Sequence, residues 1–250
     1  MPPQRALRIG AVAAVIGGIL ALAGNILHPR ESGQLDDAES LLAVAARSDT
    51  WVIDHLVILI AVTLLLLAFY GLSRSFTGEP GRSWARFAWA MAIIGVVFAL
   101  TLMLAEATAM AALADTWANG SGADRDVALA AGRAIVELSL TLSVGAMLFL
   151  FGAAPVLFGL AMLTSDDYAS WLGWVGVIFG SLGVATGVIQ VLTRLTTLTQ
   201  FVLFPIAAIV ITVWIIYLGM LMWRKSREAV AEAAHQTARQ SAHPIHRDVP

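Results

Sequence analysis

The chain contains no cysteine, a single lysine and few charged residues of either sign. Without cysteine there are no disulfides, thiolate metal sites, cysteine-ligated iron–sulfur clusters or cysteine nucleophiles. The only lysine, Lys225, follows the last apolar stretch, which excludes a retinal Schiff base within the helices. Charged residues make up 13% of the 250 residues, against about 25% in soluble domains. The chain is therefore not an ordinary soluble globular protein.

Several common functional motifs are also missing. The sequence has neither a phosphate-binding glycine loop nor the Gly-x-Ser-x-Gly motif of hydrolases. The net charge of −2 provides no basic excess for binding nucleic acid, so no nucleic-acid partner is expected. Nucleotide-binding loops, serine-hydrolase elbows and nucleic-acid binding are excluded as starting hypotheses.

Long apolar stretches dominate what is present, with 59% hydrophobic residues and a mean hydropathy of +0.81. The clearest is 51–70, WVIDHLVILIAVTLLLLAFY, which carries no charge, glycine or proline from Leu56 to Tyr70. A bilayer core about 30 Å thick needs roughly 20 mostly apolar residues in a helix. This segment therefore predicts a membrane span that begins near the polar pair Asp54 and His55.

The hydropathy pattern predicts an all-α, polytopic membrane bundle with six transmembrane helices in residues 1–225. The fourth helix is long, and Pro155 is expected to kink it or to mark where it leaves the bilayer. Asp36 and Glu39 resemble a capping box, which predicts a short amphipathic helix in the first outer loop, over the mouth of the bundle. Residues 226–250 are expected to form a largely disordered cytoplasmic tail. The six spans are predicted at about 7–27, 52–72, 85–113, 128–155, 170–192 and 200–223.

Arginine and lysine are distributed unequally between the two predicted sides of the membrane. Cytoplasmic loops of membrane proteins carry an excess of these residues. With six spans, the richer side is the one that holds both termini. We therefore expect a multi-pass protein of the cell (inner) membrane with both termini cytoplasmic. The basic residues near helix ends on that side are Arg5, Arg8, Arg74, Arg82, Arg86, Arg224, Lys225 and Arg227.

The ionisable residues within the predicted spans fall mainly in the outer half of the membrane. A charge at the bilayer centre costs about 2.5 to 3.5 kcal/mol on insertion scales, so such groups usually face the bundle interior or a wet cavity. The sequence thus predicts a polar, ligand-binding cavity open to the extracytoplasmic side. Its candidate residues are Asp54, His55, Glu106, Arg133, Glu137 and Gln190.

Each candidate also has a simpler structural interpretation. Arg133 and Glu137 are four residues apart and are placed to neutralise each other on one helix. Asp54 and His55 fit equally as N-terminal residues of their helix, and His28 as a cap at the membrane interface. Glu106 is different, because its neighbours on the same helix provide no partner. It needs one from another helix, or else a proton or a metal.

Three classes of function remain open, and catalysis is undecided in all of them. In the first, His28, His55, Glu106 and Glu137 bind a metal, for which imidazole and carboxylate ligands are suited, or His28 and His55 hold a haem. The second class is a proton-coupled carrier that uses Glu106 and Glu137. The third is an accessory subunit, in which a glycine face on the fifth helix binds a partner helix or a second copy of the chain. That face consists of Gly173, Gly176, Gly180, Gly183 and Gly187.

The passage from the fourth to the fifth span, LFGLAMLTSDDYASWLGWVGVIFGSLG, carries a family resemblance through Gly159, Ser165, Leu172, Gly173 and Gly180. It resembles uncharacterised six-helix bacterial integral membrane proteins that are known only as a domain of unknown function. In that family, proline usually occupies the position of Ala169 or Ser170. The resemblance implies a six-span fold and a membrane location, and it transfers no site residues.

Overall fold

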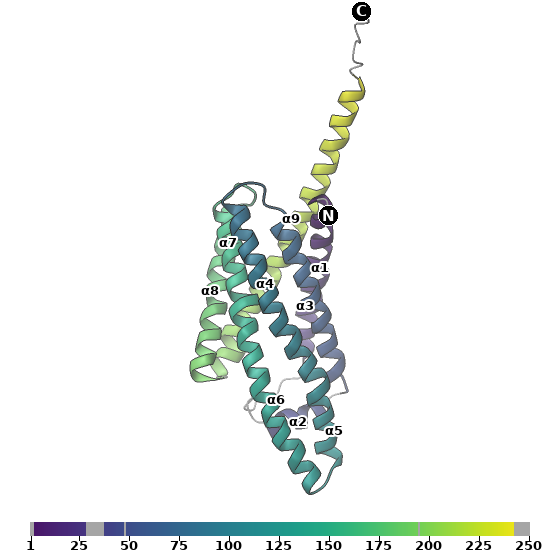
Figure 1. The fold of residues 1–250 in the computed structure, drawn as a ribbon, viewed down its shortest axis with the longest axis vertical. Coiled ribbons are helices and arrows are strands. Elements are labelled where there is room, and N and C mark those ends of the chain that lie inside the picture. The colour runs from purple at the N-terminus through teal and green to yellow at the C-terminus, as the bar shows by residue number, and fades with distance from the viewer. Residues whose placement is uncertain (1–2, 29–37, 48, 195, 243–250) are drawn as a thin grey trace, which may run out of the picture.

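The computed structural model describes residues 3–28, 38–47, 49–194 and 196–242, within which every regular element is a helix (Figure 1). Six of the helices are long and apolar enough to cross a membrane. This confirms the predicted all-α bundle of a multi-pass membrane protein. In chain order the elements are α1 (Pro3–Leu27), α2 (Ala38–Arg47), α3 (Trp51–Ser73), α4 (Gly81–Leu104), η1 (Ala105–Met110), α5 (Ala111–Asn119), α6 (Ala123–Leu148), η2 (Phe149–Ala153), α7 (Ala154–Leu163), α8 (Ser170–Thr193), η3 (Thr199–Leu203) and α9 (Phe204–Ala242), where η marks a π-helical segment.

The bundle has two ends, which differ in what they carry. At one end α1 finishes and α3 begins, and α2 packs there against α5 and α6; we call this the His55 end (Figure 1). At the opposite end lie the start of α1 and the turns at 74–80 and 164–169, and α9 continues past the bundle there (Figure 1). We call this the terminal end, because α1 begins and α9 ends on that side (Figure 1).

The amphipathic helix predicted in the first outer loop is α2. Its apolar face is buried, with Leu42 fully covered, and packs against Trp51, Met110 and Val136. The cluster closes the His55 end over the cavity described below. The residue proposed to start the capping box, Asp36, lies outside the described residues.

Close helix packing depends on glycine at a few points. α1 and α3 approach so closely that a Cβ on Gly71 would lie 2.6 Å from the Cα of Gly10. The glycine face of α8 is also used inside the chain: Gly173 packs against Gly159, and Gly183 against the backbone of Phe151. Because η2 and α7 already cover this face, a partner helix would have to contact another face of α8.

Two of the π-helical segments have an evident cause in the sequence. Both η2 and η3 end two residues before a proline, at Pro155 and Pro205 respectively. Proline has no N–H to donate to the carbonyl four residues earlier, and its ring clashes with that carbonyl. A π turn widens the helix and accommodates the proline without ending the helix. The third segment, η1, is not followed by a proline.

Two of the helices that carry predicted spans are longer than the spans themselves. The span predicted at 85–113 lies in a helix that runs from Gly81 to Asn119, and the span predicted at 128–155 lies in one that runs from Ala123 to Leu163. Only a short turn separates α5 from α6, and within it Gly122 has a φ of 55°. The guanidinium of Arg125 lies 4.3 Å from the ring centroid of Trp117, so side-chain packing extends both helices.

The first part of the predicted tail, 226–242, is helical in the structure. α9 continues as a helix through Ala242 and projects beyond the bundle (Figure 1). Residues 226–242 are rich in alanine, arginine, glutamine and glutamate, which favour helix, and they contain no glycine or proline. Residues 243–250 lie outside the described residues.

Candidate metal site and its cavity

Three side chains from three separate elements meet at the His55 end. His28 follows the last residue of α1, His55 lies near the start of α3, and Glu106 lies in the π-helical segment η1. One ligand atom from each residue can be chosen so that all three lie within 4.8 Å of one another. The His28 and His55 rings are in edge contact, with centroids 4.8 Å apart. Three of the four residues proposed as metal ligands therefore lie together in the structure.

The hydrogen bonds of His55 determine whether its Nε2 can accept a proton or bind a cation. Its Nδ1 lies 2.7 Å from the carbonyl oxygen of Trp51. A carbonyl only accepts, so Nδ1 carries a proton and donates it. The other nitrogen, Nε2, lies 3.0 Å from Oε2 of Glu106. A favourable contact between these two atoms requires either one shared proton or one cation that both atoms ligate.

Trp51 holds both partners of this contact in place. Its indole Nε1 donates to the backbone carbonyl of Glu106 at 2.8 Å, and its own carbonyl accepts from His55. The indole ring packs against His55 with centroids 4.6 Å apart and against His28 with centroids 5.8 Å apart. Trp51 is 2% exposed. Residues whose rotamers are locked in this way provide the fixed geometry that a metal site needs.

A cavity of about 240 Å³ extends from this cluster into the bundle. His28 and Glu106 lie on its wall together with Asn25 and Gln200, whereas the rest of its lining is mostly apolar. His55 is fully buried behind this wall and reaches the cavity through Glu106. The predicted polar cavity is thus polar at one end only.

All three π-helical segments line this one cavity. Glu106 comes from η1, Phe151 from η2, and Gln200 and Phe201 from η3. Single π turns inside α-helices are rare and are frequent at functional sites. Their convergence from three different helices on one cavity marks it as the candidate functional site.

The structure leaves four of the predicted site residues outside this cluster. Arg133 and Glu137 are exposed on the outer face of α6, and Glu137 pairs at 2.5 Å with Arg194 at the end of α8. Glu137 is therefore not placed as a fourth metal ligand. Asp54 lies in the first turn of α3 and accepts a hydrogen bond from Thr50 at 3.1 Å. Gln190 is buried in α8, away from the cavity lining.

Sequence reasoning missed Trp51, Ser139 and Ser143 as parts of the site. Ser139 and Ser143 line the cavity and are four residues apart on α6. Trp51 and His55 are four residues apart on α3. Residues with this spacing share one helical face. A search of each apolar helix for polar residues spaced four apart would have found Ser139 and Ser143 from the sequence alone.

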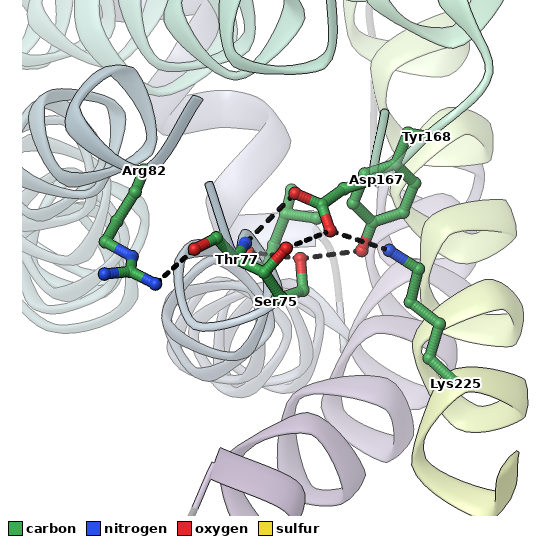
Figure 2. Close-up of polar contacts among 7 residues, drawn as sticks. Ser75, Thr77, Arg82, Asp167, Tyr168 and Lys225 are labelled. Carbon is green, nitrogen blue, oxygen red and sulfur yellow. Dashed lines mark hydrogen bonds and ion pairs between the residues drawn. The ribbon is translucent and has the colours of Figure 1, made fainter. Parts of the chain in front are cut away.

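A second polar cluster lies at the terminal end (Figure 2). The Tyr168 hydroxyl donates to Ser75 at 2.7 Å, and Thr77 donates to the carboxylate of Asp167 through its amide and its hydroxyl at 3.0 and 3.1 Å. Lys225 of α9 lies 3.8 Å from Asp167 and 3.9 Å from the centroid of the Tyr168 ring. These contacts join the turns after α3 and α7 to α9 and close this end of the bundle.

The ligand atoms of His28, His55 and Glu106 suit a divalent transition metal. Zinc binds histidine nitrogen and carboxylate oxygen at about 2.0 to 2.2 Å, so two ligands on one tetrahedral ion are about 3.3 Å apart. The Nε2–Oε2 distance of 3.0 Å is close to that separation. By contrast, direct contact between the His28 and His55 rings leaves no room for a porphyrin between them. The His55–Glu106 pair has the spacing of two metal ligands, and His28 completes a three-ligand set after a small shift, because two ligands of one zinc ion lie at most about 4.2 Å apart whereas the three ligand atoms lie within 4.8 Å of one another. The ring contact does not fit a haem held by both histidines.

Comparison of the chain with protein-family models, with curated proteins and with solved structures finds no match. The resemblance of the region around Gly159 and Gly180 to a family of unknown function stays a prediction. The functional argument therefore rests on the geometry of the cluster and its cavity.

Proposed function

We propose that this multi-pass membrane protein binds a divalent transition-metal ion through His28, His55 and Glu106. The contact between His55 and Glu106 carries the proposal. It places an imidazole nitrogen and a carboxylate oxygen 3.0 Å apart while the other imidazole nitrogen donates to a backbone carbonyl. Histidines that bind metals in proteins almost always donate their second ring N–H in this manner.

Zinc is the metal that we expect first. Two histidines and one glutamate form a ligand set that is used by catalytic zinc sites, which keep a fourth position open. Manganese and ferrous iron accept the same ligand types. His28 and Glu106 lie on the cavity wall, so the open position would face the cavity. A small molecule in the cavity would then reach the metal directly.

Metal analysis of the detergent-purified protein tests this proposal. We expect close to one zinc per chain after incubation with zinc and removal of the excess, and large losses in His55→Ala and Glu106→Gln. Glu137→Gln is the matched control, because this carboxylate is exposed and pairs with Arg194. A wild type that retains no zinc, manganese or iron overturns the proposal, as does retention of metal by both site variants.

A proton-coupled carrier is the second candidate, because one shared proton satisfies the His55–Glu106 contact as well as a metal does. The contacts among Thr77, Asp167 and Lys225 close the terminal end, as a carrier loaded from the other side requires (Figure 2). Infrared difference spectroscopy of metal-free protein tests this candidate. It predicts a carboxyl band that changes with pH and that is missing in Glu106→Gln.

We also propose that the His55 end faces the extracytoplasmic side of the cell membrane and that both termini are cytoplasmic. Arg5, Arg8, Arg74 and Arg82 gather at the terminal end, in α1 and around the turn at 74–80. An excess of basic residues favours the cytoplasmic side. A metal at His55 would then be loaded from outside the cytoplasm.

A further inference from the structure

The cavity beside the candidate metal site has a polar end and an apolar body. Its polar groups gather near His28 and Glu106, and the walls below are built from Leu65, Met103 and Met147. Phe151 and Phe204 complete the apolar part. A water-soluble metabolite would bury its polar groups against these walls without hydrogen bonds, which costs free energy. The lining instead matches a molecule with one polar end and a hydrocarbon chain.

Ser139 provides an independent sign of a ligand. It is 8% exposed and lines the cavity, and its hydroxyl oxygen makes no hydrogen bond with any residue that the structure describes. Other hydroxyls in these helices do find a partner: Thr141 donates to the carbonyl of Glu137 and Thr212 to that of Ala208. Buried polar atoms are nearly always paired. The Ser139 oxygen is itself covered, so a turn of this side chain about its χ1 would present the unpaired hydroxyl to a polar group in the cavity.

We propose that the cavity binds a single-chain lipid with an oxygen-bearing head group, a fatty acid or a fatty alcohol. The head lies between Ser139 and Glu106, and the chain lies along Leu65, Met103 and Met147. Methionine is flexible and polarisable, so it adapts to hydrocarbon chains of different shape. Pockets for drug-sized ligands measure about 300 to 1,000 Å³. The cavity of about 240 Å³ lies below that range, which favours a short single chain over a two-chain phospholipid.

The charges around the proposed head-group position favour a hydroxyl or carboxylate head group over a cationic amine. The Glu106 carboxylate is held by His55, so the pair leaves no unbalanced anion for a cationic head. This inference rests in part on the proposed function, since a metal at His28, His55 and Glu106 would bind a carboxylate head through its open position. The alcohol needs only the hydrogen bond to Ser139. The two head groups therefore separate the contribution of the metal from that of the cavity.

Fluorescence quenching by fatty acids and fatty alcohols with a bromine on the carbon next to the head group tests the inference, because Trp51 lies beside Glu106 at the polar end of the cavity. Trp51 lines the cavity, so a bound brominated chain quenches its emission. We expect saturable quenching of the full-length protein in detergent micelles, and a smaller amplitude in Trp51→Phe. Ser143→Phe places a large ring into the cavity and should abolish saturable quenching. Ala134→Phe, on the exposed face of the same helix, is the matched control and should leave it unchanged.

A second variant keeps the test sharp if Ser143→Phe fails to fold. Ser139→Ala removes only one hydroxyl and should weaken binding about three- to tenfold, the value of one net hydrogen bond. The inference is overturned if quenching does not saturate in the wild type, or if Ser143→Phe and Ala134→Phe bind equally. Metal content is measured on the same samples. A metal-free wild type that still shows saturable quenching refutes the metal site and leaves the lipid site supported.

Discussion

Trp51 contacts every member of the candidate cluster through a different part of its structure. Its carbonyl fixes the proton on His55, its indole N–H holds the backbone of Glu106, and its ring packs against His28. It is therefore a positioning residue and not itself a ligand. Partners that orient metal ligands typically contribute 10- to 100-fold to metal affinity. Trp51 thus links the three elements that carry His28, His55 and Glu106.

Tyr168 is the residue whose ionisation should reveal the packing of the terminal end. Burial raises the pKa of its phenol above the usual value, and the carboxylate of Asp167 acts in the same direction. The unfolded chain therefore loses this proton first, near the ordinary tyrosine pKa of about 10. The contribution of Tyr168 to stability is fully present below that pH and is lost as the pH rises through its folded pKa. We expect the melting temperature to fall more steeply above about pH 10 in the wild type than in Tyr168→Phe.

Tyrosinate absorbance supplies the direct measurement. At a pH just above the ordinary tyrosine range, the folded wild type and Tyr168→Phe should show the same tyrosinate absorbance, because Tyr168 is still protonated. After unfolding, the wild type should show one tyrosinate more. A difference already present in the folded state would mean that the phenol ionises freely and would contradict the role of burial.

The prolines show how much of the helix geometry the sequence predicts. Pro155 was predicted to kink its helix or to mark where the helix leaves the bilayer, and the structure shows a π-helical segment before it in a helix that continues to Leu163. A proline always deprives the carbonyl four residues earlier of its hydrogen-bond donor, but packing against neighbouring helices decides whether the backbone kinks, widens or ends there. The π turn at Glu106 has no such signal in the sequence. It depends on tertiary contacts, including the bond from Trp51 to the Glu106 carbonyl.

The close approach of α1 and α3 gives a prediction for Gly71. A Cβ there would lie 2.6 Å from the Cα of Gly10 and 2.9 Å from the carbonyl oxygen of Ala6, and neither backbone atom can move aside easily. We expect Gly71→Ala to destabilise the bundle by roughly 1 to 3 kcal/mol, as overpacking does. Gly78→Ala is the control, since a Cβ on Gly78 meets nothing within 4 Å. Thermal melting in detergent compares them, and equal melting temperatures would show that the two helices separate without cost.

For the whole molecule, the hydropathy pattern gave the six spans, because length and apolar content are set by the bilayer. It indicates how far along its helix each ionisable residue lies but not the direction in which its side chain points. Glu137 and Ser139 lie at nearly the same depth of α6, yet Glu137 is exposed and Ser139 lines the cavity. Helix rotation is decided by packing against neighbouring helices. That is why His28, His55 and Glu106 were predicted together with residues that turn out to face outward.

The orientation of the bundle is tested by cysteine labelling, and the absence of native cysteine removes any background. Ser121 is exposed in the turn between α5 and α6 at the His55 end, and Gly78 is exposed in the turn at the terminal end. In intact bacterial host cells with a permeabilised outer membrane, an impermeant maleimide should label Ser121→Cys and spare Gly78→Cys. Gly78→Cys should react only after the inner membrane is opened. The reverse pattern would place the cluster of His28, His55 and Glu106 on the cytoplasmic side, where metal and lipid would have to arrive from within the cell.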